Sequence, residues 1–462
     1  MSRPFSRAVT AATLKATAAI RTGRSRLEAR FAAWSPDGPG PRRRAPAGHR
    51  HIGYYLWVYP LLSETFIRRE IAALRETGLD VTVVADMPGD GPELDPSLQP
   101  LVQEARYLLP VSPAALILRA LAFLARRPLT FVRLLFYVLV VPWDSNRTLA
   151  RDMRVFGKAI AIAAIMEDCG VTHVHSPWAN VNAFMLLIVS RLLGTGFSLQ
   201  ARAHDIHRDD SAFALPQKFR HADFIVTNTR YNEASLRAML PPAPRSRVHC
   251  IHNGIDLDDF VPDATPVRQA DQFHILSVAR LIEPKGITVL LRACRLLLDR
   301  GLRFECTIIG GTEEPLYTAY RVQVAVLHRQ LGLTDAVRFC GAAPFDQVLD
   351  AMRTADLFVL PCVVAANGSK DITPNSLIEA MAMKLPVVST RITAIPEIVT
   401  HGESGMLVPP GDVDALAATM QQVLEDPRLR QRLGDCARAA VERKFDVRAN
   451  IDGYVRLFGE AT

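Results

Sequence analysis

The stretch Asp371–Ala382, with the sequence DITPNSLIEAMA, decides the architecture that we expect for this chain. Its two acids stand eight residues apart around a Pro-Asn pair that can open a helix, because the fixed φ of Pro374 suits the first helical turn. Free amides of Asn375–Leu377 would point toward the preceding loop, where a phosphate or sugar oxygen could accept from them. Glu379 could accept from a ribose diol, while Asp371 could meet sugar hydroxyls or simply complement the helix dipole.

Outward from this stretch, short apolar strands alternate with helices through both halves of the chain, as in parallel sheets covered by helices. In the second half we expect strands over 274–278, 303–309, 337–340, 357–360 and 387–389, with helices over 287–299, 319–331, 345–355, from 375 and onward to the end. In the first half we expect strands over 52–58, 81–85, 171–175, 198–203, 224–228 and 248–252, with helices over 64–77, 181–193, near Pro216 and over 232–239. The sequence therefore predicts an α/β fold of two similar doubly wound units.

Two loops that follow strands of the second half contain residues suited to anions. Ligands of open parallel sheets bind outside the carboxyl ends of the strands. Arg280 and Lys285 precede a helix whose N-terminal amides also favour a diphosphate, although such a pair also occurs in ordinary solvated loops. Gly310 and Gly311 would let the backbone approach a ligand closely, or simply form a turn. Neither half contains a G-x-G-x-x-G sequence, which argues against a dehydrogenase.

Taken together, these patterns resemble glycosyltransferase family 4 over roughly residues 52–450. The spacing from Asp371 to Glu379 is similar to the E-x7-E signature of that family, and Arg280 with Lys285 resembles its diphosphate-binding pair. Further agreements are Asn253-Gly254-Ile255-Asp256, Pro386-Val387-Val388-Ser389-Thr390 and Gly405-Met406-Leu407-Val408-Pro409-Pro410-Gly411-Asp412. A subgroup that builds exopolysaccharides such as colanic acid is similar in Ser63-Glu64-Thr65-Phe66, in Glu70, Ile71 and Leu74, and in Ala365-Ala366-Asn367-Gly368.

The resemblance implies a GT-B fold, in which two facing Rossmann-like domains hold a UDP- or GDP-sugar between them. It implies a retaining, metal-independent hexosyltransferase with no bound cofactor, acting on a glycan or lipid-linked acceptor. Front-face departure and attack, with a phosphate oxygen drawing the acceptor proton, would suit such an enzyme. The matching positions are His204 and Asp371 as catalytic residues; Arg280, Lys285, Gly310, Gly311, Asp371, Pro374, Asn375, Ser376, Leu377 and Glu379 as donor contacts; and Ser63, Glu64, Thr65 and Asp205 on the acceptor side.

Three residues depart from the family pattern. Asp371 stands where Glu is usual, Ile372 where Gly is common, and Lys384 where a small residue is usual. The shorter Asp371 bears on the identity of the donor sugar more than on activity. The departures at Ile372 and Lys384 motivate an alternative, an inactive family member that acts as a membrane-associated scaffold. A nucleotide-sugar epimerase or hydrolase is a further alternative, because fold alone does not separate these functions.

The positive charge of the chain is concentrated in its N-terminal arm. The formal net charge is +7, while residues 1–50 carry ten arginines and one lysine against two acids, so the remainder is close to neutral. No zinc-finger spacing, basic region with heptads or ribonucleoprotein motif accompanies this arm, so we do not expect nucleic-acid binding. Its charges also interrupt the apolar run that a secretory signal needs, which predicts a cytoplasmic location.

Residues 114–143 are the most apolar segment, but interspersed arginines leave no run long enough to span a bilayer. Apolar residues interleaved with arginines and aromatics match a helix pair lying in the membrane interface, the alternative being a hairpin packed on the domain. With the basic arm as a second membrane signal, we expect peripheral attachment to the inner face of the plasma membrane.

We expect a flexible arm (1–50), an acceptor-side domain (51–255), a nucleotide-sugar domain (256–445) and a C-terminal helix (446–462) that could cross back to the first domain. The seven cysteines lack C-x-x-C spacing, which argues against a disulfide framework. No acid or cysteine completes a metal-ligand set with His173, His175, His204 or His207. Asp256 resembles part of a D-x-D metal motif but is expected to be solvated or to cap a helix, and Asp412 is expected at a helix N-cap.

Overall fold

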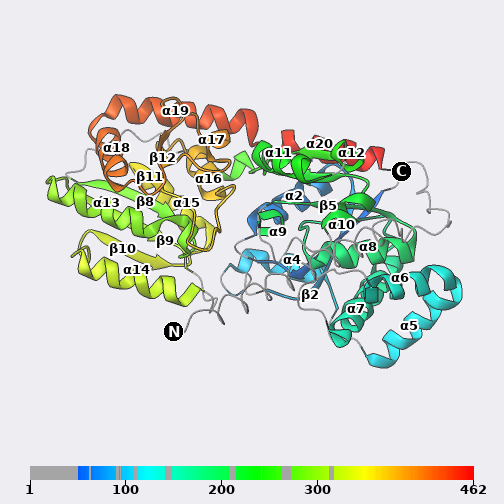
Figure 1. Cartoon of the computed structure of the whole chain (residues 1–462). Coiled ribbons are helices and arrows are strands. Elements are labelled where there is room, and N and C mark those ends of the chain that lie inside the picture. Colours follow the sequence, from blue (N-terminus) through cyan, green and yellow to red (C-terminus); the bar gives the residue numbers. More distant parts are fainter. Residues whose placement is uncertain are drawn as a thin grey trace, which may run out of the picture.

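The computed structural model describes residues 50–61, 64–89, 93, 95–108, 112–140, 148–202, 204–207, 215–240, 242–262, 272–311 and 317–461. Over these residues the chain forms two lobes that lie side by side, each built on one parallel sheet with helices packed against it (Figure 1). The lobes correspond to the two halves of the strand and helix alternation in the sequence. The expected α/β fold of two doubly wound units is thereby confirmed.

The first lobe contains a seven-stranded sheet in the order β3-β2-β1-β4-β5-β6-β7. Its central strand β1 pairs in parallel with β2 on one side and β4 on the other, so that Tyr54 lies opposite both Val83 and His175. The strands are β1 (His51–Val58), β2 (Asp80–Met87), β3 (Arg106–Tyr107), β4 (His173–Ser176), β5 (Gly196–Gln200), β6 (Ile225–Thr227) and β7 (Val248–Cys250). The helices are α2 (Thr65–Glu76), η1 (Pro96–Leu98), α4 (Gln99–Glu104), α5 (Pro113–Arg126), α6 (Pro128–Val140), α7 (Leu149–Asp168), α8 (Val181–Leu193), α9 (His204–His207), α10 (Leu215–His221), α11 (Arg230–Met239) and α12 (Pro242–Arg245).

The second lobe contains a six-stranded parallel sheet in the order β10-β9-β8-β11-β12-β13. Its strands are β8 (Phe273–Val278), β9 (Phe304–Ile309), β10 (Val337–Gly341), β11 (Leu357–Leu360), β12 (Val387–Thr390) and β13 (Met406–Val408). The helices, with η2 in the segment between the lobes, are η2 (Leu257–Asp259), η3 (Glu283–Lys285), α13 (Ile287–Asp299), α14 (Thr318–Gln330), α15 (Phe345–Thr354), α16 (Asn375–Ala382), α17 (Ile395–Ile398), α18 (Val413–Glu425) and α19 (Pro427–Lys444). Asp412 caps α18 by accepting from the amide of Ala415, as expected.

In each sheet the order of strand addition reverses beside a central strand, β1 in the first lobe and β8 in the second. Loops at the carboxyl ends of the strands that flank such a reversal are the usual ligand sites of doubly wound sheets. The loop after β1 leads into α2, the loop after β8 contains Arg280 and Lys285, and the loop after β11 leads through Asp371 to α16. The topology therefore directs attention to these three loops.

The last helix, α20 (Val447–Glu460), belongs to the first lobe although it follows the second in sequence (Figure 1). It packs along α2, and its apolar side chains are buried in the same cluster as Ile52, Tyr54 and Leu74. Tyr454 and Phe458 are nearly inaccessible and contact the ring of His175. The chain therefore crosses between the lobes twice.

Several elements differ from the sequence expectation. The sequence pattern indicated neither α7 nor β13, and β5 ends at Gln200 rather than at residue 203. Helix α7 lies between α8 and the α5–α6 pair, so apolar side chains occur around much of its circumference and its periodicity is weak. Strand β13 has only three residues, too few to show a period of two.

Lys384 has a φ of 58°, in the left-handed region where glycine is favoured. This backbone conformation is a physical reason for the small residue that the family pattern has at this position. The Lys384 side chain is exposed and forms a surface ion pair with Asp435 at 3.2 Å.

No helix of the described segments is long and apolar enough to cross a membrane.

Candidate functional site

The loop after β8 brings Lys285 against Asp371, which lies in the loop after β11. The ammonium group of Lys285 forms an ion pair with the Asp371 carboxylate, and the two side chains are only 15% and 17% exposed. The amide of Ala366 donates to the Glu283 carboxylate at 3.0 Å and fastens the two loops together. Gly286 then turns the chain into α13 with a φ of 68°. The structure thus brings together a cation and an acid that stand 86 residues apart.

The first turn of α16 faces the same loops. Among the described residues, no acceptor lies within hydrogen-bond distance of the amides of Asn375 and Ser376, so these donors are available to a ligand. The amide of Leu377 donates to the Pro374 carbonyl at 3.0 Å, so the expectation that it is free was wrong. The Ser376 hydroxyl donates to the Val278 carbonyl at 2.7 Å and ties α16 to the end of β8.

Glu379 lies one turn further along α16 and is 8% exposed. Its carboxylate accepts from Arg69 of α2 at 2.9 Å, so a side chain of the first lobe reaches the second at this point. The carbonyl of Asp371 accepts from the Thr393 hydroxyl at 2.7 Å. Thr393 has a φ of 49°, which is rare for a β-branched residue and marks strained backbone beside the site.

Gly310 permits a close approach between the loops that follow β8 and β9. Its φ is 124°, and a Cβ atom there would lie 2.2 Å from the Ala279 carbonyl oxygen. Glycine is therefore required for this packing. Gly311 is less constrained, because the nearest atom to its Cβ position is 3.7 Å away.

The first lobe contributes Glu64 and Thr65 at the start of α2. Burial raises the pKa of Glu64 to about 7, and the nearby charges of Arg202 and Arg280 oppose this shift. A carboxyl group from the first lobe thus lies within electrostatic range of Arg280 in the second. Thr65 lines a cavity of about 270 Å³ whose walls include α2, η1, η2 and Phe345 of α15.

Asp205 is 3% exposed and acts on the backbone of its own lobe. Its carboxylate accepts from the amides of Ala179 at 2.8 Å and Arg202 at 3.0 Å, which joins the loops after β4 and β5. His204 is the first residue of α9, directly after the loop that Asp205 fixes. Ser63, which was expected on the acceptor side, lies outside the described residues.

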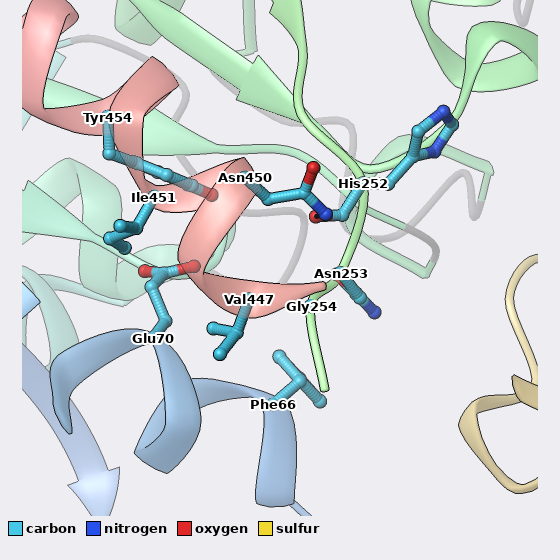
Figure 2. A pocket seen from close by; sticks show the side chains of 9 residues that line it. All are labelled: Phe66, Glu70, His252, Asn253, Gly254, Val447, Asn450, Ile451 and Tyr454. Atoms are coloured by element: carbon cyan, nitrogen blue, oxygen red, sulfur yellow. Dashed lines mark hydrogen bonds between the residues drawn. The ribbon is translucent and has the colours of Figure 1, made fainter. Parts of the chain in front are cut away.

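A small cavity lies where α2, the segment 252–254 and α20 meet (Figure 2). Its volume of about 10 Å³ suits roughly one water molecule, so it cannot hold a sugar. Glu70 on its wall accepts from Tyr54 at 2.9 Å and from Arg202 at 3.0 Å, which matches the buried carboxylate with a cation. The cavity belongs to the joint between the lobes.

Sequence reasoning missed Arg69, which joins the two lobes directly, and Arg202, whose partner Asn253 donates to Asn375 of the second lobe at 3.1 Å. Arg202 reaches Asn253 at 2.5 Å in the interlobe segment. In α2, Arg69 is one of several charged residues with helical spacing, and nothing in the sequence distinguishes it from Arg68 or Arg75. Arg69 can be identified only from the packing of one lobe against the other.

The paired histidines of β4 serve the core. His173 and His175 both bond the Ser198 hydroxyl, each at 2.7 Å, and both rings contact Phe458. Burial and the neighbouring charges of His173 and Arg202 hold the pKa of His175 well below its usual value. Within the described ranges no group of three or more His, Cys, Asp or Glu side chains could hold a metal ion.

Two family models match the chain. The model described as Glycosyltransferase Family 4 matches residues 63–259, and the model described as Glycosyl transferases group 1 matches residues 272–426. Similar curated proteins include the amylovoran biosynthesis glycosyltransferase AmsK of Erwinia amylovora, 29% identical, with 86% of this chain and 96% of AmsK covered. The putative colanic acid biosynthesis glycosyltransferase WcaL of Escherichia coli K12 is also 29% identical, with 79% of this chain and 88% of WcaL covered.

Solved structures of the same architecture include a glycosyltransferase from Rickettsia africae, with 16% identity, a TM-score of 0.66 and coverage of 90% of this chain and 99% of that one. HepE from Anabaena, solved in complex with UDP and glucose, has 17% identity, a TM-score of 0.64 and coverage of 89% and 100%. Because these chains are covered almost completely, the likeness includes both lobes. At such identities it concerns the fold.

Proposed function

Because the chain belongs to glycosyltransferase family 4 and has the GT-B fold, we propose that it moves a sugar from a UDP- or GDP-sugar onto a glycan or lipid-linked acceptor. The observation that carries this proposal is the Lys285–Asp371 ion pair beside the open amides of Asn375 and Ser376, with Glu379 on the same helix. The names of AmsK and WcaL favour exopolysaccharide or cell-surface glycan synthesis as the setting.

In the proposed complex the diphosphate lies between Arg280, Lys285 and the first amides of α16. Cations and helix amides fixed before the reaction stabilise the charge that develops on the leaving nucleoside diphosphate. Glu379 accepts from the ribose diol and Asp371 from the donor sugar, while Gly310 sets the packing of the two loops and Gly311, beside which there is space, lets the backbone approach the donor. The positive charge that the reaction needs thus comes from side chains and amides, which favours a mechanism without a metal.

We further infer a retaining transfer, in which the acceptor hydroxyl attacks the face that the diphosphate leaves and a phosphate oxygen takes its proton. The acceptor approaches from the first lobe, where Ser63, Glu64 and Thr65 precede or begin α2. His204 is the proposed catalytic residue of that lobe, and the Asp205 carboxylate holds its loop through the Ala179 and Arg202 amides. We also propose that the boundary between the two domains lies at residues 255/256 and that the protein is cytoplasmic.

The test is release of nucleoside diphosphate by the purified chain from a panel of UDP- and GDP-sugars, with and without a membrane extract. We expect release that needs the extract and continues in the presence of EDTA. In Glu379→Ala we expect release to fall at least a hundredfold, because the variant loses a charge-assisted hydrogen bond and leaves Arg69 unpaired. Glu403→Ala, which changes an exposed acid of the same lobe, is the matched control and should match wild type. NMR of the product should show that the transferred sugar keeps the anomeric configuration that it has in the donor.

Other outcomes separate the alternatives. Release without any acceptor would favour a hydrolase, and interconversion of the donor without release would favour an epimerase. Neither binding nor release with any donor, from a protein shown to be folded, would support the scaffold instead.

We propose that α5 and α6 contact the membrane surface. They lie at the end of the first lobe that is farther from the second lobe (Figure 1). Their large apolar residues are about half exposed or more, an unusual density for a surface in water: Ile117, Leu118, Leu121, Leu129, Val132 and Phe136. Arg119 and Arg126 beside this patch form ion pairs with Asp168 and Glu167 of α7 at 2.8 and 2.7 Å, so the proposal rests on the apolar side chains, which can enter the membrane interface.

Replacing Leu121 and Val132 together by glutamate is expected to lower binding to phosphatidylglycerol vesicles by more than tenfold in a sedimentation assay. Each apolar side chain contributes roughly 1.5–3 kcal/mol when buried, and the new charges repel the anionic surface. Val322→Glu, at an exposed apolar position of α14 in the other lobe, is the control and should bind as wild type does. Equal vesicle binding by the double variant would assign the patch to another role.

A further inference from the structure

Helix α2 of the first lobe is connected at two points to the start of α16, the helix that holds the proposed donor contacts. At one end, Arg69 donates to the Glu379 carboxylate at 2.9 Å, and each side chain is only 11% exposed. At the other end, Glu70 joins a chain of hydrogen bonds through Arg202 and Asn253 to Asn375. Adjacent residues of α2 are thus linked to positions of α16 that are four residues apart, Arg69 directly and Glu70 through two intermediate side chains.

The guanidinium group of Arg69 is held from the second lobe as well. Its central carbon lies 5.3 Å from the ring centre of Phe260 and 5.6 Å from that of Phe345, distances at which a cation is attracted to an aromatic face. The two rings meet edge to face with their centres 5.6 Å apart. Arg69 therefore has a fixed position from which it contacts a single oxygen of Glu379.

We infer that Arg69 is a positioning residue that orients the Glu379 carboxylate for the ribose diol and thereby makes donor binding depend on the contact between the lobes. The inference rests on the proposed function, in which Glu379 binds the ribose. An ionised carboxylate offers acceptors only, on two oxygens. Arg69 contacts Oε1, so the carboxylate has a defined rotation that leaves Oε2 for a hydroxyl.

Charge matching adds a second reason. A carboxylate that is 8% exposed is costly to bury unless it is paired, and Arg69 supplies the pair. Arg68 of α2 also lies within electrostatic range of Glu379. Burial is the main cause that lowers the pKa of Arg68, and the neighbouring charge of Arg69 lowers that pKa further. Asp259 of η2 lies within electrostatic range of Arg69 without forming an ion pair with it among the described contacts. Arg69 is thus the cation that directly contacts Glu379.

The test is a thermodynamic cycle between the residue and the ribose. Binding of UDP and of 2′,3′-dideoxyuridine diphosphate to the full chain is measured by calorimetry for wild type, Arg69→Gln and Arg69→Lys, with the corresponding guanosine pair in parallel. In wild type, loss of the diol should weaken binding about tenfold to hundredfold. In Arg69→Gln, affinity for UDP should fall by a similar factor while affinity for the dideoxy nucleotide changes little, so that the preference for the diol disappears. Arg69→Lys, which keeps the charge without the planar group, should restore part of that preference.

Arg75→Gln is the matched control, because Arg75 lies on the same helix in an exposed pair with Glu104 and should keep the full preference. A preference that persists unchanged in both Arg69 variants would overturn the positioning role while leaving the proposed function intact. If Arg69→Gln weakens the binding of both nucleotides equally, the positioning role is likewise overturned and the proposed function stands. If wild type binds neither UDP nor GDP, the proposed function and the inference fall together. Thermal melting identifies a variant that has lost its fold, and Arg69→Lys then decides.

Discussion

The variant Lys285→Met should turn over about 10²–10³ times more slowly than wild type at saturating donor and acceptor. In the proposed complex Lys285 stabilises the charge that grows on the departing diphosphate, and a methionine of similar length supplies none. The change also removes the cation that neutralises the Asp371 carboxylate, which is 17% exposed. The loop would then carry a net negative charge, which repels an anionic donor. Steady-state release of nucleoside diphosphate measures the effect as a fall in kcat.

The matched control is Lys384→Met, the same substitution in the same lobe at an exposed lysine with a surface ion pair. Such pairs contribute little, so its turnover should equal that of wild type. The double variant Lys285→Met with Asp371→Asn removes the unmatched acid as well and should stay slow. Recovery of wild-type turnover in that double variant would show that Lys285 serves only to balance Asp371.

Gly286→Ala should lower the free energy of unfolding by about 3 kcal/mol or more, the range of strained backbone combined with a buried clash. The residue has a φ of 68°, and a Cβ atom would lie 1.9 Å from the carbonyl oxygen of Pro361. The clashing atom is backbone, so one of two loops must move. Because these loops hold Lys285 and Asp371, the surviving folded protein should also bind donor more weakly. Urea unfolding followed by circular dichroism gives the free energy.

Gly301→Ala separates the clash from the backbone conformation. Gly301 follows the other end of α13 with a φ of 81°, and no atom lies within 4 Å of its Cβ position. Only the left-handed conformation penalises alanine there, at a cost of roughly 1 kcal/mol. Equal losses for the two variants would contradict the importance of the contact with Pro361.

Local sequence patterns predicted much of the fold, because strands buried on both faces form continuous apolar runs and their helices are amphipathic. Helices α8, α13 and the start of α16 occur where the pattern indicated them. The pattern fails where burial is not one-sided, as in α7, or where an element is as short as β13. These are consequences of tertiary packing that a window of sequence does not contain.

Some residues of the proposed site were likewise predictable from the sequence, and others were not. Lys285, Asp371 and Glu379 stand in loops or at a helix start with characteristic spacing, so the sequence indicated them. Arg69 could be identified only from the packing of the two lobes and Arg202 only from the fold of the first lobe, because their partners are 310 and 51 residues away. The Leu377 amide was misassigned because a tight first turn consumes it.

The return of α20 to the first lobe has a consequence for the order of folding during synthesis. The cluster around Ile52 and Leu74 is completed by Val447, Ile451 and Leu457, which follow the whole second lobe in the sequence. Until then this apolar surface stays uncovered, while the second lobe can already fold behind it. A nascent chain would therefore combine one finished lobe with one incomplete lobe, and the emergence of α20, rather than that of the first sheet, would set the moment at which the first lobe is completed.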